Sequence, residues 1–251
     1  MLFSSPGENE VPSGAGDFHT THWSMVLLAG QAMAPHADEA LESLCRTYWN
    51  PLYAYVRRQG HNPHDAQDLT QEFFARLLAK KYLSLANQER GRFRSFLLKS
   101  LKHFLVNEWQ RGQSQKRGGG RQFLSLDDEA AERSYLLQPA ADQMAPESLY
   151  DKLWAMTLLE RAIERLGGEY AATGRRELFD QLKPLLLVEG GGESYRQAAA
   201  VLGLSEGAVK VAVHRVRQRF REAVRAEIAQ TVATPAEVDG ELRCLMAAMS
   251  G

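Results

Sequence analysis

Apolar residues recur every three or four positions along most of the chain, which is the spacing of an amphipathic α-helix. The same periodicity predicts helices over 40–58, 65–79 and 93–109 and, after a gap, near 147–166 and over 175–188. No segment alternates apolar and polar residues as a half-buried strand does. The pattern therefore predicts an all-α fold. Its clearest helix is the third, whose apolar face holds Phe93, Phe96, Leu97, Leu101, Phe104, Leu105 and Trp109.

Breaks in this pattern divide the chain. Residues 1–19 are rich in Gly, Pro, Ser and Asn, which is typical of disorder. Gly118–Gly120 end the first set of helices, and an acidic stretch with Pro139 and Pro146 follows, which we expect to be a flexible linker. We therefore predict these parts: a disordered tail, 1–19; a helical domain, 20–118; the flexible acidic linker, 119–147; a second helical domain, 148–225; and a C-terminal extension, 226–251.

Composition narrows the class of protein. The chain has 251 residues, 44% of them hydrophobic, a net charge of −1 and 2 cysteines. Two cysteines about 200 residues apart exclude a disulfide scaffold. No run of 18 apolar residues predicts a transmembrane helix, and residues 1–16 lack the features of a signal peptide. We expect a cytoplasmic protein without membrane insertion.

The near-zero net charge conceals segregated charges. Nine Lys and Arg against one acid lie between 90 and 121, and seven against two lie between 196 and 225. Between them, residues 127–151 hold seven acids and one arginine. Two basic modules separated by an acidic linker are the simplest interpretation.

The most specific motif is SYRQAAAVLGLSEGAVKVAVHRVRQRFR at 194–221. Its first helix, 195–202, carries small residues where two helices approach closely, and Gly203 suits the turn. Ser205 can cap the second helix, and Leu204 is expected to fill the core. The pattern fits a helix-turn-helix, whose second helix enters a DNA major groove about 12 Å wide. The inward residues are Ala198, Ala199, Val209, Ala212, Val213 and Val216.

An amphipathic helix with a solvated basic face is the alternative interpretation of the last segment. The small residues, the glycine turn, the serine cap and the apolar positions are all in register, which favours the helix-turn-helix. Its predicted DNA-binding residues are Arg196, Ser205, Glu206, Lys210, His214, Arg215 and Arg217.

Two segments resemble the bacterial sigma-70 family, and most closely its extracytoplasmic-function (ECF) group. Residues 204–222 resemble the helix-turn-helix that reads the promoter −35 element, and DAQDLTQEFFARLL at 65–78 resembles the helix that binds core RNA polymerase. The resemblance implies a two-domain sigma factor that binds the polymerase β′ and β subunits and promoter DNA. It implies no cofactor and no enzymatic activity, and it leaves open an anti-sigma factor or another regulator. Such a protein would associate with the nucleoid when bound to polymerase.

The resemblance also assigns residues. Those matched to polymerase binding are Asp65, Asp68, Leu69, Gln71, Glu72 and Phe73. The helix from Phe93 falls where the family binds and opens the −10 element, and its polar candidates are Arg92, Arg94, Lys99, Lys102, His103, Asn107 and Arg111. From periodicity alone, its aromatic residues are expected in the core rather than stacked on bases. Ala208 and Val211 replace a threonine and a polar residue common in the family, so Lys210, His214 and Arg215 become the main −35 candidates.

The extension predicts one more helix. Thr234, Pro235 and Glu237 form a helix start, and the apolar residues Leu242, Leu245, Met246 and Met249 follow at helical spacing. It is either a short helix packed on its own domain or a regulatory segment.

No catalytic or metal-binding motif occurs in the sequence. Cys45 and Cys244 lack neighbouring cysteines, and His61 and His64 lack a third ligand at a suitable spacing. We expect neither a catalytic residue nor a metal. Two functional alternatives remain at this point: a stand-alone helix-turn-helix regulator and a helical protein–protein adaptor.

Overall fold

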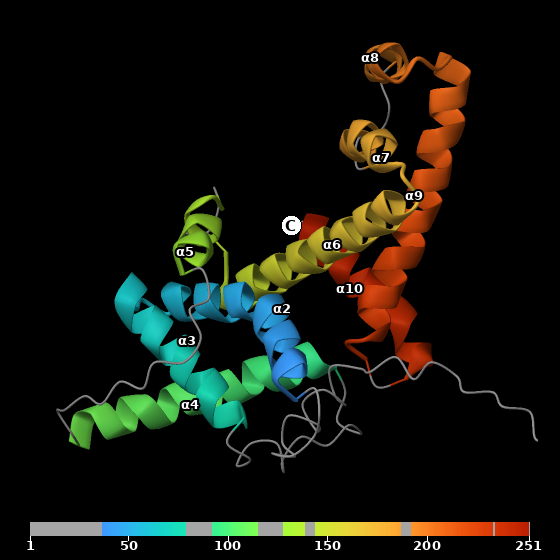
Figure 1. Ribbon diagram of the computed structural model, residues 1–251. Coiled ribbons are helices and arrows are strands. Elements are labelled where there is room, and N and C mark those ends of the chain that lie inside the picture. The colour runs from blue at the N-terminus through green and yellow to red at the C-terminus, as the bar shows by residue number, and fades with distance from the viewer. Residues whose placement is uncertain are drawn as a thin grey trace, which may run out of the picture.

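The computed structural model confirms the all-α prediction. Every regular element that it describes is a helix (Figure 1). No helix among the residues that the structure describes is long and apolar enough to span a membrane. The predicted tail, 1–19, and Gly118–Gly120 lie outside the described residues. The described residues are 37–78, 92–114, 128–138, 144–186, 192–232 and 234–250.

Three helices form the first part of the fold: α2 (Ala37–Arg58), α3 (Pro63–Leu78) and α4 (Phe93–Ser114). Aromatic side chains join them, since Phe73 of α3 lies 5.8 Å from Phe104 of α4 and Tyr48 of α2 lies 5.3 Å from Phe93, centroid to centroid. Pro51 lies inside α2, and the ribbon of α2 bends without the helix ending (Figure 1).

Part of the predicted flexible linker is a helix, α5 (Asp128–Leu136), that packs against α2. The Glu132 carboxylate accepts hydrogen bonds from Arg57 at 2.9 and 3.0 Å and from the Tyr53 hydroxyl at 2.6 Å. The Arg57 guanidinium also lies 5.0 Å from the ring centre of Tyr135. This segment is therefore held against the first domain instead of being a solvated tether, because its acidic residue meets a half-buried arginine.

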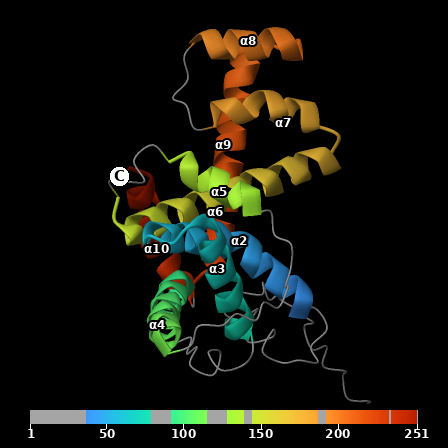
Figure 2. The same cartoon turned by 90° about the vertical axis from the view of Figure 1, so that its left-hand side faces the viewer.

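The second part of the fold begins with a long helix, α6 (Pro146–Ala172). It continues through α7 (Arg176–Leu182), η3 (Lys183–Leu185), α8 (Gly192–Leu202) and α9 (Glu206–Ala229). Helices α6, α7 and α8 cross α9 one above another (Figure 2). The start of α9 therefore lies far from α4, while its end reaches the level of α6.

The two predicted domains share one hydrophobic core. Tyr48 of α2 and Tyr150 and Trp154 of α6 are fully buried in a cluster that continues to Val213 of α9. A hydrogen bond of 2.6 Å from Arg161 of α6 to the Thr47 hydroxyl adds a polar contact between α6 and α2. Because packing continues across the boundary between them, the structure does not separate the two predicted domains. The boundaries therefore stay predictions about which part of the chain carries which function.

The extension forms η4 (Pro235–Glu237) and α10 (Val238–Ser250), and α10 packs on α6 and α9. The predicted helix start is confirmed, since the Glu237 carboxylate accepts a 3.1 Å hydrogen bond from the Thr234 backbone N–H. The predicted apolar face is partly wrong. Met246 and Met249 are exposed, whereas Glu241 is buried beside Leu245.

Candidate polymerase and nucleic-acid interfaces

Helices α8 and α9 form the predicted helix-turn-helix. Gly203 has φ +65°, a conformation that favours glycine, and the Ser205 hydroxyl caps α9 by accepting the Ala208 N–H at 3.2 Å. Behind the turn, Val209 and Val213 are buried. Leu204 was wrongly expected in the core, since it is 43% exposed. The inward residues Val216, Ala198 and Ala199 are also buried, and Ala212 is half-buried.

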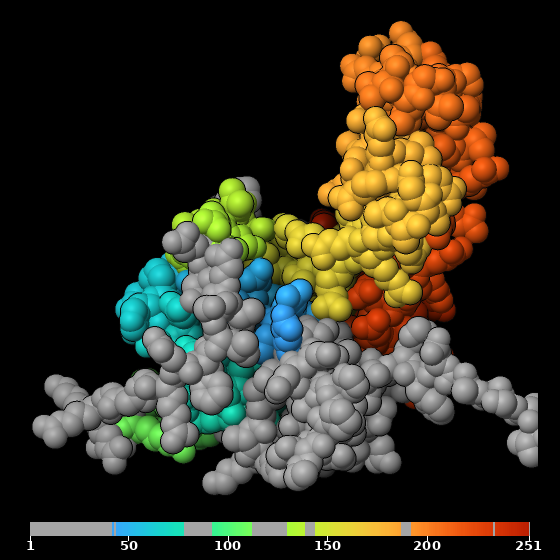
Figure 3. Space-filling model, in the orientation of Figure 1, coloured from blue at the N-terminus to red at the C-terminus, as the bar shows by residue number. Residues whose placement is uncertain are grey.

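The first turns of α9 present exposed basic side chains. Lys210, His214 and Arg215 are all exposed, and the helix-turn-helix stands out from the rest of the molecule (Figure 3). The Lys210 ammonium lies 5.9 Å from the centre of the Tyr195 ring. Arg196 approaches Glu206 at 3.7 Å, which links α8 to the start of α9. This protruding surface has the size and charge to enter a major groove.

Arg217 differs from these basic residues although it lies on the same helix. Its guanidinium donates two hydrogen bonds, at 3.2 and 2.8 Å, to the Leu185 carbonyl at the end of η3. Leu185 is buried, so this arginine satisfies a backbone acceptor inside the domain. Arg217 therefore holds α9 to η3 in this structure.

A polar stripe follows the outward face of α4. Lys99, His103 and Asn107 are exposed at intervals of four residues, as expected for one helix face. The expected core position of Trp109 is wrong, since this side chain is 66% exposed. The other aromatic residues of α4 follow the prediction, because Phe93 and Phe104 are buried and Phe96 packs partly against the core.

Two other α4 candidates form ion pairs within the chain. Lys102 contacts Glu147 of α6 at 2.6 Å, and this hydrogen bond raises the pKa of Lys102 and lowers the pKa of Glu147. Arg111 contacts Glu108 on its own helix at 2.9 Å. The side chains of Lys102, Glu147 and Arg111 are 43%, 47% and 63% exposed, so water screens both pairs and they can exchange with a partner at small cost.

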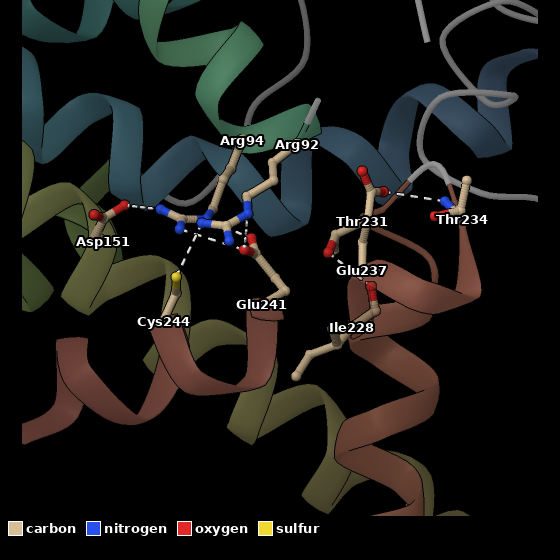
Figure 4. A network of polar contacts seen from close by, with 9 residues as sticks. All are labelled: Arg92, Arg94, Asp151, Ile228, Thr231, Thr234, Glu237, Glu241 and Cys244. Carbon is tan, nitrogen blue, oxygen red and sulfur yellow. Dashed lines mark hydrogen bonds and ion pairs between the residues drawn. The ribbon is translucent and has the colours of Figure 1, made fainter. Parts of the chain in front are cut away.

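The remaining two, Arg92 and Arg94, enter a network with the C-terminal helix (Figure 4). Glu241 of α10 contacts Arg92 at 2.8 Å and Arg94 at 2.5 Å. Arg94 also pairs with Asp151 of α6. Burial alone would lower the pKa of Arg94, but the hydrogen bond and charge of Glu241 and the charge of Asp151 raise it. Since Arg94 is buried, it cannot reach DNA in this conformation.

The polymerase-binding candidates on α3 divide into two groups. Asp65, Asp68 and Glu72 are exposed, whereas Phe73 is buried. Asn62 caps α3 by accepting the Asp65 N–H at 2.9 Å, so Asp65 also belongs to the helix start. Leu69 packs partly against the core and Gln71 is half-buried. The exposed carboxylates are the side chains that can meet a partner directly, and Phe73 can act only by supporting the helix.

Within the described residues, no group of three or more His, Cys, Asp or Glu side chains is arranged to hold a metal ion. His64 is exposed and lies 3.3 Å from the Asp68 carboxylate. Cys45 is buried, which raises the pKa of its thiol to about 12.

Comparison with known proteins identifies the family. The model of the ECF sigma factor family matches residues 31–226. The chain is 28% identical over 223 residues to the ECF RNA polymerase sigma factor SigE of Mycolicibacterium smegmatis, covering 89% of this chain and 72% of SigE. It is 27% identical over 178 residues to the ferric citrate uptake sigma factor FecI of Escherichia coli, covering 69% of this chain and 84% of FecI. No solved structure matches. Because the family model spans most of the chain, the chain belongs to the ECF sigma factor family and is a sigma factor that directs transcription initiation.

Proposed function

We propose that this sigma factor binds its partners through three separate surfaces. The carboxylates of α3 bind core polymerase through its β′ subunit, the stripe on α4 binds the −10 region, and the start of α9 binds the −35 element. The main support is the contrast on α9 between the exposed Lys210, His214 and Arg215 and the internally bonded Arg217. Family membership favours this function over a stand-alone regulator or an adaptor.

Asp68 is the most direct test of the polymerase-binding surface. The Asp68 side chain is 65% exposed and lies 3.3 Å from the even more exposed His64, so changing it leaves the core intact. Asp68→Lys should weaken capture of core polymerase several-fold. Glu177→Lys, an equal charge change at an exposed position of α7, is the matched control. Equal capture by Asp68→Lys and wild type would remove this assignment.

Trp109 is the best candidate for contact with separated bases. An exposed indole beside a polar stripe can stack on an unpaired base, and such stacking contributes about 1 to 3 kcal/mol per base. Trp109→Ala should reduce promoter opening, measured as permanganate reactivity of unpaired thymines, with little effect on the initial closed complex. Val106→Ala removes another exposed apolar side chain of α4 and serves as the control. Equal loss in both variants would contradict stacking.

Reconstituted transcription tests the function as a whole. Purified core polymerase, a genomic fragment library and this protein should yield promoter-specific transcripts that are absent without it. Transcripts whose start sites are the same with and without the protein would overturn the proposal. The promoter found in this way then supplies the duplex for binding measurements.

A further inference from the structure

The network around Glu241 joins three segments that are far apart in the sequence. Arg92 and Arg94 come from the start of α4, Asp151 from α6, and Glu241 from α10 (Figure 4). The Glu241 side chain is 0% exposed, and that of Arg94 is 8% exposed. The C-terminal helix therefore places a buried carboxylate between two arginines of the first domain.

Further contacts attach the C-terminal segment to its surroundings. The Phe93 backbone N–H donates to the Thr231 carbonyl at 3.3 Å, which connects α4 to the turn after α9. Arg225 of α9 contacts Asp239 of α10 at 2.7 Å. Val238 and Leu245 are buried, so α10 is seated by apolar packing as well as by charge. The first turn of α4 is thus held by both backbone and side-chain bonds.

A carboxylate and a phosphate compete for the same guanidinium, because both accept its paired N–H donors. Arg94 contacts Glu241 and Asp151 and lies 4.6 Å from the ring centre of Trp154. A phosphate could reach it only after Glu241 leaves. Buried ion pairs contribute little net stability compared with apolar residues of similar volume, so stability alone does not account for this network.

We propose that residues 234–250 form an intramolecular clamp. In the clamped state Glu241 occupies Arg92 and Arg94, and seating of α10 and DNA binding by the start of α4 exclude each other. The proposal rests on the assignment of α4 to DNA made above. In the free protein, two of the arginines assigned to DNA therefore cannot bind it until the C-terminal helix is displaced.

Glu241→Gln is the first test, because it removes the charge and keeps the shape of the side chain. The probe is a fluorescent single-stranded oligonucleotide of mixed sequence, bound by the full chain between 50 and 200 mM NaCl. Two freed arginines should steepen the slope of log K against log salt by about 1.4. If both proteins bind alike at 200 mM, the variant binds about 7-fold more tightly at 50 mM.

Glu222→Gln is the matched control, since it removes one negative charge from an exposed position of α9 whose bonded neighbour is Gln218 on the same helix, outside the network. An equal gain in this variant, or no gain in a folded Glu241→Gln protein, would overturn the clamp. Adding Arg94→Gln to Glu241→Gln should lower the steepened slope by about 0.7. If the full gain persisted in the double variant, Arg94 would not be its source.

The second test needs no variant and therefore does not depend on how Glu241→Gln folds. Cys244 lies 2.9 Å from Arg92 and is half-buried, whereas Cys45 is fully buried and serves as an internal reference. Because linkage is reciprocal, saturating oligonucleotide should accelerate thiol labelling of Cys244 and leave Cys45 unchanged. Unchanged labelling of Cys244 in saturated protein would refute the clamp.

Lys99→Gln separates failure of the clamp from failure of the α4 assignment. Lys99 is exposed on α4 and lies outside the network. If this variant weakens oligonucleotide binding but Glu241→Gln has no effect, the clamp is wrong and the DNA-binding assignment stands. If neither variant changes binding, the assignment of α4 to DNA is wrong as well.

Discussion

Arg215 and Arg217 lie two residues apart on α9. The structure predicts that replacing each by alanine affects a different property: promoter binding for Arg215 and stability for Arg217. Arg215 is exposed, so its loss should leave folding unchanged and weaken promoter binding. Arg217 donates two hydrogen bonds to the Leu185 carbonyl. Hydrogen bonds from a charged donor contribute about 1.5 to 3 kcal/mol, so we expect Arg217→Ala to lower the free energy of unfolding by about 2 kcal/mol. For a chain of this size, that lowers the Tm by about 4 to 8 °C.

Two measurements separate the arginines. Urea unfolding should give a lower midpoint for Arg217→Ala and the wild-type midpoint for Arg215→Ala. Binding of holoenzyme to its promoter fragment, measured against salt, should lose about 0.9 from the slope for Arg215→Ala only, which corresponds to one phosphate contact. A stable Arg217→Ala protein whose slope falls by this amount would refute the structural role and restore this residue to the DNA-binding set.

Three further predictions concern the fold. The hydrogen bond from Arg57 lowers the pKa of Glu132 below 4.5, so this contact stabilises the protein above pH 4.5 and is lost as the pH falls towards the lowered value. Glu132→Gln should therefore flatten the loss of stability measured by unfolding as the pH falls below 4.5. Phe73→Ala should cost about 3 to 5 kcal/mol in urea unfolding, and the folded fraction should still bind polymerase. Gly203→Ala has space for its methyl group but a φ of +65°, so thermal unfolding should show a loss of about 1 to 2 kcal/mol.

The helix-turn-helix could be predicted because its determinants are local. A glycine at a left-handed turn, a serine cap and buried valines three and four residues apart all lie within one short segment. Trp109 was misassigned because its prediction rested on periodicity alone. Helical periodicity identifies which face is apolar, but it does not say where the neighbouring helix ends. Trp109 continues the apolar face of α4 to a position where it remains 66% exposed.

The contacts made by Arg94 and Glu241 could not be predicted, because they join residues 147 positions apart. One clue was available in the sequence. Glu241 follows Val238 by three residues and precedes Leu245 by four, so it lies on the buried face of its helix. An acid in that position requires a partner. Local patterns do not identify the partner, and they equally fail to separate Arg215 from Arg217.

The acidic block explains how a chain with a net charge of −1 can carry DNA-binding surfaces. Glu147 contacts Lys102 and Asp151 contacts Arg94, so acids that follow the first domain lie against its cations. Among the lysines and arginines assigned to the −10 region, Lys99 alone has no ion pair within the described part of the chain. Each of the others must exchange a carboxylate for a phosphate, and salt weakens both interactions. The salt dependence of DNA binding by the clamped protein should therefore be much smaller than its basic residues suggest, and it should grow as these internal pairs are released.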